Sequence, residues 1–402
     1  MCLTVRVRPL PRRWVIVLAL FVVTFGISTP LAAYGVFLPV LADAFGWSRG
    51  ALSTALSINL LLGGVAGFAI GAVADRHGPR AMLVTTVALA GAGFGLVGVV
   101  GALWHLYLFV GVLAGIGMSS FYLLGAATVS HWFEERRALA LALVLVGFNL
   151  GYISGGPLAA WLIARLGWRA AYALLGGGCG LLTVLAALTV RLPRAGERPP
   201  RRAVTAGATT RDVTLREALA DPRQWFLNVS WFVLSGLNLM ISVHIVPFAR
   251  DRGISLAAAS LGLTAYGVGA VSGRVASGVV SEHIGSVPTI RIGFLLQIVA
   301  LTGVWWAPSP DMLLAALVLF GVGFAASDTM ITKVIPDVFG MRALGAIMGV
   351  LTLGWRIGAA LGPAAAGFLY DATGSYAMPF GAAPLAVLVS WGFFALGSRR
   401  SA

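Results

Sequence analysis

Long apolar segments, separated by short polar connections, follow one another along almost the whole chain. Each of twelve segments is long enough for a helix across the hydrocarbon core of a bilayer, which needs about 20 residues. These segments are residues 14–41, 49–74, 81–102, 104–131, 138–164, 168–190, 224–248, 255–281, 288–307, 311–335, 343–370 and 376–397. Residues 191–223 contain no such segment and are rich in Arg, Pro and Thr, so we expect them to form a polar linker.

Several polar and glycine positions of the first half recur in the second half at an almost constant spacing. A shift of 207 residues relates Gly46 to Gly253, Ser48 to Ser255, Asp75 to Glu282 and Gly78 to Gly285. A shift of 206 residues relates Phe133 to Phe339, Arg136 to Arg342 and Pro157 to Pro363. This ordered series indicates an internal duplication, with a six-helix bundle over 1–190, the linker 191–223 and a second six-helix bundle over 224–402. Many transporters place their substrate between two such halves.

The composition indicates the class of protein. Hydrophobic residues make up 59% of the chain and charged residues only 10%, against about a quarter charged in soluble domains. We therefore expect an all-α membrane protein whose twelve transmembrane helices form two pseudo-symmetric bundles in the lipid bilayer. The sequence contains no phosphate-binding loop, no nucleophile motif and no Cys and His cluster for a metal, so we expect neither an enzyme nor a cofactor.

The net charge of +14 could indicate a nucleic-acid partner, but the positions of the basic residues argue against one. The basic residues cluster in alternate connections, at 6–13, 76–80, 136–137, 191–223 and 399–400. Cytoplasmic loops of membrane proteins carry this excess of basic residues. We therefore expect a monomeric, multi-pass protein of the cell (inner) membrane that binds no nucleic acid, with both termini and the linker in the cytoplasm.

The connection after the second segment, GAVADRHGPR at 71–80, combines small, acidic and basic residues. Gly78 permits a tight turn, and Asp75 can pair with a basic neighbour or a helix end. The stretch resembles the loop signature GxxxDRxGxR of the major facilitator superfamily, and a degenerate copy stands at 278–285. The resemblance implies the fold of that family and a cytoplasmic gate. The residues expected in this gate are Gly71, Asp75, Arg76, Gly78, Arg80, Arg136 and Glu282.

A second stretch, WFEERRALA at 132–140 with glycines at 147 and 151, leads into the fifth segment. It resembles the fifth-helix signature of the monocarboxylate transporters, although Glu135, Ala142, Val144 and Val146 depart from that pattern. A generic basic loop followed by helix-packing glycines is the alternative interpretation. The run FGWSR at 45–49 is similar to the same branch and to its oxalate:formate antiporter relatives.

Two arginines lie deep within apolar segments of the second half. Arg274 is about 8 residues, or roughly 12 Å of helix, from the polar end at Glu282, and Arg356 is about 14 residues beyond Arg342. Charged residues at such depth usually face a cavity or a partner. In the branch that the chain resembles, an eighth-helix arginine binds the substrate carboxylate, and the oxalate:formate antiporter adds an eleventh-helix lysine. The resemblance therefore implies a binding role for Arg274 on the eighth segment and for Arg356 on the eleventh. A guanidinium also offers a carboxylate a bidentate fork.

Asp328 is the only acidic residue deep in an apolar segment, and it leaves two interpretations open. It could balance Arg274 in an ion pair that only holds helices together, or it could couple transport to protons. Ala270 stands where animal monocarboxylate transporters have an eighth-helix aspartate, which leaves their proton-coupling scheme in doubt.

Amphipathic side chains also occur on the helices that could line a cavity. These residues are Tyr34, Tyr122, Tyr152, Tyr266, Trp355, Asn59, Asn149 and Asn238. We expect Tyr122 and Trp355 to bind substrate, because Tyr122 follows two glycines of the fourth segment and Trp355 adjoins Arg356. We expect the others to pack or to form hydrogen bonds between helices.

These observations predict a secondary active transporter that moves a small organic anion, a mono- or dicarboxylate, by alternating access. Arg274, Arg356, Tyr122 and Trp355 would bind the anion, and Asp328 would balance charge or couple transport to protons. Proton-coupled symport and anion exchange both remain open. The alternative is an efflux transporter of hydrophobic or drug-like compounds. The family of drug/proton antiporters has an arginine in its fourth helix, and the absence of an arginine from the fourth segment here disfavours this alternative.

Overall fold

The computed structural model describes residues 12–133, 137–193, 213–340 and 344–398, and every regular element in these ranges is a helix. The first half contains α1 (Arg12–Phe45), α2 (Arg49–His77), α3 (Pro79–Leu96), η1 (Val97–Val99), α4 (Leu103–Leu106), η2 (Tyr107–Ala114), α5 (Gly115–Gly117), α6 (Phe121–Trp132) and α7 (Arg137–Thr189). The second half contains α8 (Leu215–Ala220), α9 (Pro222–Asp251), α10 (Leu256–Ile284), α11 (Ser286–Trp306), α12 (Pro310–Phe339), α13 (Leu344–Thr373) and α14 (Ala377–Gly397).

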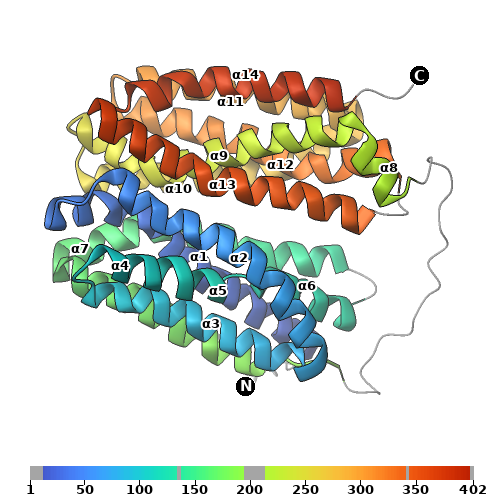
Figure 1. The fold of residues 1–402 in the computed structure, drawn as a ribbon, viewed down its shortest axis with the longest axis horizontal. Coiled ribbons are helices and arrows are strands. Elements are labelled where there is room, and N and C mark those ends of the chain that lie inside the picture. The colour runs from blue at the N-terminus through green and yellow to red at the C-terminus, as the bar shows by residue number, and fades with distance from the viewer. Residues whose placement is uncertain (1–11, 134–136, 194–212, 341–343, 399–402) are drawn as a thin grey trace, which may run out of the picture.

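The helices of the two halves form two groups that lie side by side (Figure 1). We call the end that carries α8 and the last turn of α14 the proximal end. The opposite end, with the connections 43–50, 251–255 and 371–376, is called the distal end. Most contacts between the described parts of the two halves are made by the helix pairs α2 with α13, α7 with α10 and α1 with α9.

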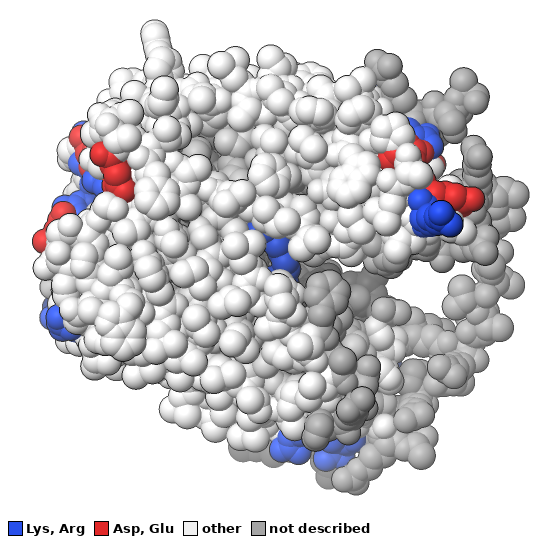
Figure 2. Space-filling model, in the orientation of Figure 1, with Lys and Arg blue, Asp and Glu red and all other residues white. Residues whose placement is uncertain are grey.

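The predicted fold class is confirmed. Ten of the described helices are long and apolar enough to cross a membrane. One of these, α7, supplies two of the twelve predicted spans, because Gly167 at φ 74° breaks it between the fifth and sixth segments. The short helices α4 to α6 together supply the fourth span. On the face that Figure 2 shows, the charged side chains gather mainly at the two ends, and a basic side chain is also visible between the halves. The rest of this face between the ends is uncharged and suited to lipid.

The residues that recur between the halves occupy equivalent backbone positions. Gly78 and Gly285 adopt φ 85° and 86°, where residues with a Cβ are strained, and each ends one helix and begins the next. Ser48 accepts the N–H of Ala51 at 3.2 Å, and Ser255 accepts that of Ala258 at 3.3 Å, so the two serines cap α2 and α10. The sequence repeat therefore preserves helix ends.

One expectation about the helices was wrong. The fourth segment is not one helix over 104–131, because Tyr107–Ala114 is wound as a π-helix and residues 118–120 separate α5 from α6. Glycines at 115 and 117 and serines at 119 and 120 favour helix weakly, which allows this interruption.

The predicted linker 191–223 includes a short helix. It contains α8, whose first turn is closed by a capping box between Thr214 and Glu217, and the start of α9. The rest of the predicted linker, residues 194–212, lies outside the described residues.

Candidate functional site

A cavity of about 270 Å³ lies between the two halves. Its wall includes six aromatic side chains, three asparagines and three charged residues. They are Phe121, Phe148, Tyr152, Tyr266, Phe324, Trp355, Asn59, Asn149, Asn238, Arg274, Asp328 and Arg356. Because both halves contribute to the wall, a movement of one half against the other must change the shape of the cavity.

The cavity carries one excess positive charge among the residues that the structure describes. Arg274 on α10 and Asp328 on α12 form an ion pair, with Nη2 3.6 Å from Oδ2. Both side chains remain partly exposed, by 34% and 23%, and the buried Nε of Arg274 has no hydrogen-bond partner. Arg356 lines the same cavity from α13 and makes no ion pair or hydrogen bond with any described residue. The pair is neutral, so Arg356 supplies the net charge.

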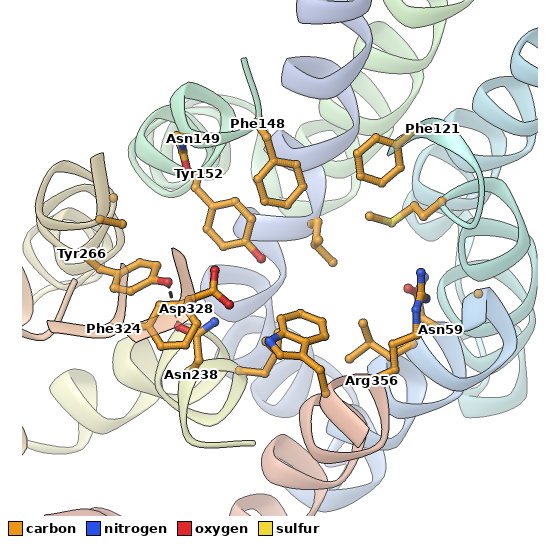
Figure 3. A pocket seen from close by; sticks show the side chains of 18 of the residues that line it. Asn59, Phe121, Phe148, Asn149, Tyr152, Asn238, Tyr266, Phe324, Asp328 and Arg356 are labelled. Carbon is orange, nitrogen blue, oxygen red and sulfur yellow. Dashed lines mark hydrogen bonds between the residues drawn. The ribbon is translucent and has the colours of Figure 1, made fainter. Parts of the chain in front are cut away.

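Arg356 lies where the two halves meet. Its side chain packs on α2, such that a Cβ added to Gly64 would lie 3.1 Å from Cδ of Arg356, and one added to Gly63 would lie 3.6 Å from Nη1. The two glycines therefore leave room for the arginine stem. Figure 3 shows Arg356 beside Asn59 of α2, on a different side of the cavity from Asp328.

Two hydrogen bonds use part of the polar capacity of the cavity wall. Tyr266 donates its hydroxyl hydrogen to Oδ1 of Asn238 at 2.7 Å, and Asn59 donates from Nδ2 to the carbonyl of Val110 at 2.7 Å (Figure 3). These bonds satisfy groups that would otherwise be costly to bury. They also leave the guanidinium of Arg356 as the strongest donor without a partner among the described residues of the wall.

Aromatic rings cover the wall on the side of the first half. Phe148 of α7 lies between Phe121 and Tyr152, at centroid distances of 6.0 and 5.2 Å. Phe121 is also the first residue of α6, so the N-terminal end of that helix borders the cavity. A helix N-terminus carries partial positive charge, which has the same sign as Arg356.

The distal end is closed by polar bonds between the halves. Arg49, at the start of α2, donates two hydrogen bonds of 2.8 Å to the carboxylate of Asp251 at the end of α9. Its guanidinium lies 3.9 Å from the ring centroid of Tyr370. Asp371 accepts the backbone N–H groups of Arg49 and Gly50 at 2.9 and 2.8 Å. Asp371, which belongs to the second half, thus satisfies N–H groups at the start of α2 in the first half. These bonds hold the two halves together.

A buried histidine forms a second layer of bonds below this closure. His244 of α9 has Nε2 2.8 Å from the carbonyl of Pro363 and 3.2 Å from Oγ of Ser53. Since a carbonyl only accepts, Nε2 carries the hydrogen, and Nδ1 accepts from the hydroxyl of Tyr376 at 2.7 Å. Burial raises the pKa of Tyr376, so its hydroxyl keeps the proton that it donates.

The proximal end differs from the closed distal end. Figure 2 shows the surface hollowed between the halves towards the proximal end.

The close approach of the two halves at the distal end predicts that replacing one glycine there will prevent the distal end from closing. A Cβ added to Gly367 of α13 would lie 2.7 Å from Cα of Gly50 and 2.8 Å from the carbonyl oxygen of Arg49, so Gly367→Ala should hold the distal ends apart. Gly349→Ala on the same helix is the matched control, because nothing lies within 4 Å of its added Cβ. Cross-linking of cysteines introduced at positions 44 and 373 measures closure. We expect at least a fivefold lower cross-linking rate for Gly367→Ala alone, and an unchanged rate would contradict the described closure.

Comparison with known proteins establishes the family. The profile of the Major Facilitator Superfamily matches residues 16–249 and 229–401, which together cover most of the chain. The chain belongs to this superfamily. Human monocarboxylate transporter 11 is 30% identical over 387 residues, which cover 91% of this chain and 79% of that protein. The oxalate:formate antiporter of Oxalobacter formigenes is 26% identical over 295 residues, covering 73% of this chain and 69% of the antiporter.

A solved structure supports the same fold. The bacterial homolog of the human lysosomal transporter Spinster, in an inward-facing and occupied conformation, superposes with a TM-score of 0.78 over 98% of both chains. At 20% identity, this likeness concerns the fold alone. Family and relatives together show that the protein is a membrane transporter and not an enzyme, and the resemblance to the monocarboxylate and oxalate:formate branch is confirmed.

The residues that the sequence singled out for binding fall in one place. Arg274, Asp328, Trp355 and Arg356 all line the central cavity of this superfamily member, although they come from three helices. The side chain of Tyr122 lies outside the described part of the chain.

Other wall residues were not selected from the sequence. Tyr152, Tyr266 and the three asparagines were expected to pack or to form hydrogen bonds between helices, and Tyr266, Asn238 and Asn59 do form such bonds. Phe121, Phe148 and Phe324 carried no signal that distinguishes a cavity-facing ring from a lipid-facing one.

The expected gate residues of the superfamily loop signature lie at the proximal end. Gly78 forms the turn between α2 and α3, Arg80 is exposed on the first turn of α3, and Glu282 is exposed near the end of α10. Gly71, Asp75 and Arg76 belong to α2, but their side chains lie outside the description, as does Arg136. The contacts of the gate therefore stay a prediction.

Proposed function

We propose that this transporter moves small organic anions with a carboxylate group, a mono- or dicarboxylate, through the cavity between its halves. The excess positive charge of that cavity is the observation that carries the proposal, because Arg356 is a half-buried guanidinium with no partner among the described residues. A cation at this depth of a membrane protein usually marks a substrate or ion pathway. The names of the monocarboxylate transporter and the oxalate:formate antiporter among its relatives support the same class of substrate.

Each charged residue of the cavity receives a role in this proposal. Arg274 and Arg356 face the bound anion, and Trp355 and Tyr122 complete the site. Asp328 balances Arg274 while the site is empty. When an anion approaches Arg274, Asp328 loses part of its compensation and can take up a proton, which would give symport with protons. Exchange of one anion for another needs no such step, and is the second coupling mode that the site allows.

The halves rock about this site in the proposed mechanism. The distal bonds of Arg49 and Asp371 close one end, and Gly71, Asp75, Arg76, Gly78, Arg80, Arg136 and Glu282 control the other end. If the basic connections are cytoplasmic, the proximal end faces the cytoplasm, and a distally closed protein is inward-facing. The protein would act as a monomer in the cell (inner) membrane.

Uptake into proteoliposomes tests the proposal. We expect saturable, protein-dependent uptake of at least one labelled carboxylate from a panel of mono- and dicarboxylates. A pH gradient that drives uptake into empty vesicles indicates proton coupling, whereas a requirement for internal carboxylate indicates exchange. Liposomes without protein are the control. Transport of a neutral hydrophobic compound, without uptake of any carboxylate, would contradict the proposal and support drug-like efflux.

A further inference from the structure

The geometry points to Arg356 as the anchor of the carboxylate, and to a monocarboxylate with an apolar, ring-sized body as the substrate. This inference rests on the proposed function and specifies the substrate class of the same site. It assigns different roles to the two arginines, because only one of them is already paired.

The charges of the cavity favour a monoanion. Arg274 is compensated by Asp328 at 3.6 Å, whereas Arg356 has no partner among the residues that the structure describes. One bound carboxylate therefore makes the charged side chains and the ligand neutral in sum. A dianion such as oxalate would leave one uncompensated negative charge in a cavity whose wall already contains Asp328, and an uncompensated charge away from water is unfavourable.

The wall opposite the guanidinium favours an apolar body. Phe121 and Phe148 face the cavity across from Arg356, with their rings nearly parallel at an interplanar angle of 3° (Figure 3). Tyr152 continues this row 5.2 Å beyond Phe148. A ligand held at Arg356 thus extends towards rings, with which an aromatic body makes favourable contacts.

The position of Arg356 also couples binding to movement of the halves. Its stem packs on the glycines of α2 while its backbone belongs to α13, so an anion bound there lies at the seam between the halves. Since α2 and α13 separate or approach when the halves rock, the affinity of this anchor depends on the conformation. Arg274 and Asp328 both belong to the second half and lack this property.

Calorimetric titration of the full chain, in detergent or nanodiscs, with four small-molecule probes tests the inference. Phenylacetate carries the charge and the ring, acetate lacks the ring, oxalate is a dianion, and phenylacetamide is uncharged. We expect phenylacetate to bind at least tenfold more tightly than acetate or oxalate, and phenylacetamide not to bind. Arg356→Ala and Arg356→Gln should each weaken phenylacetate binding at least a hundredfold, and Arg356→Lys about tenfold, because lysine keeps the charge but not the fork.

Two further variants make the outcome decisive. Arg291→Ala is the matched control, because Arg291 is exposed on α11 outside the cavity, and it should leave binding unchanged. The double variant Arg274→Ala with Asp328→Ala keeps the net charge and should weaken phenylacetate binding less than tenfold. Two results would overturn the inference but not the proposed function. One is tighter binding of oxalate than of phenylacetate. The other is a folded Arg356→Gln variant whose affinity for phenylacetate lies within threefold of that of the parent protein. Absence of binding by all three carboxylates would overturn the proposed function as well.

Discussion

Replacing Arg49 by alanine should open the distal end of the protein. The substitution removes two charge-assisted hydrogen bonds to Asp251 and the contact of the guanidinium with Tyr370. Bonds to charged groups contribute about 1.5–3 kcal/mol in proteins, and the partial exposure of Arg49 places the expected loss near about 2 kcal/mol. A change of about 2 kcal/mol shifts the ratio of distally closed to distally open molecules roughly thirtyfold.

Spin labels on cysteines at positions 44 and 373 measure this shift, because these positions are exposed at the distal end of opposite halves. The matched control is Arg169→Ala. Arg169 lies at the same end and donates to the carbonyls of Gly98 and Val100, but these bonds stay within the first half. We expect a longer distance population for Arg49→Ala and not for Arg169→Ala. Equal distance distributions in all three proteins would show that the Arg49 bonds do not hold the halves together.

Replacing Asp328 by asparagine should admit a dianion. The change raises the net charge of the three charged wall residues that the structure describes from +1 to +2, because Arg274 loses its partner and Arg356 has none among the described residues. Two unit charges about 8 Å apart, at an effective dielectric constant of about 20, interact by about 2 kcal/mol, so the two charges of oxalate interact with the Asp328 carboxylate by about 4 kcal/mol in sum. We therefore expect oxalate to bind roughly a thousandfold more tightly to Asp328→Asn than to the parent protein.

The same site provides the opposite change as a comparison. Arg274→Ala lowers the net charge of the wall to zero, so carboxylate binding should weaken. It also leaves Asp328 unpaired, so the folded protein should lose about 2 kcal/mol of stability. This loss is smaller than the roughly 3–5 kcal/mol expected when a fully buried ion pair is broken. Asp337→Asn is the control, because Asp337 is exposed on α12 outside the cavity. Calorimetric titration with oxalate compares the variants. An oxalate affinity that Asp328→Asn leaves unchanged would show that charge balance does not select the substrate.

The span pattern could be read from the sequence because the bilayer sets a length that each helix must meet. Apolar segments of that length recur along the chain, and the repeated Ser48 and Ser255 cap helices at equivalent places. Local composition did not reveal the π-helix of the fourth span, since Tyr107–Ala114 is apolar throughout and satisfies either winding.

The candidate site could be predicted only in part. A deep charge is visible in one sequence, so Arg274, Asp328 and Arg356 were evident as interior residues. Which arginine is compensated depends on packing between helices, because Asp328 approaches Arg274 from a different helix while Arg356 packs against α2. The rings of Phe121 and Phe148 could not be assigned, since the orientation of an apolar helix decides whether a ring faces lipid or substrate.

The location of the bound anion tests the central claim most directly. Crystals of the full chain grown with 4-bromophenylacetate can be measured at the bromine absorption edge, where anomalous scattering locates the bromine without reference to the protein model. The account predicts a single peak in the cavity next to Phe148, with the carboxylate density on the guanidinium of Arg356. A peak outside the cavity between the halves, or carboxylate density that contacts Arg274 and not Arg356, would contradict the account.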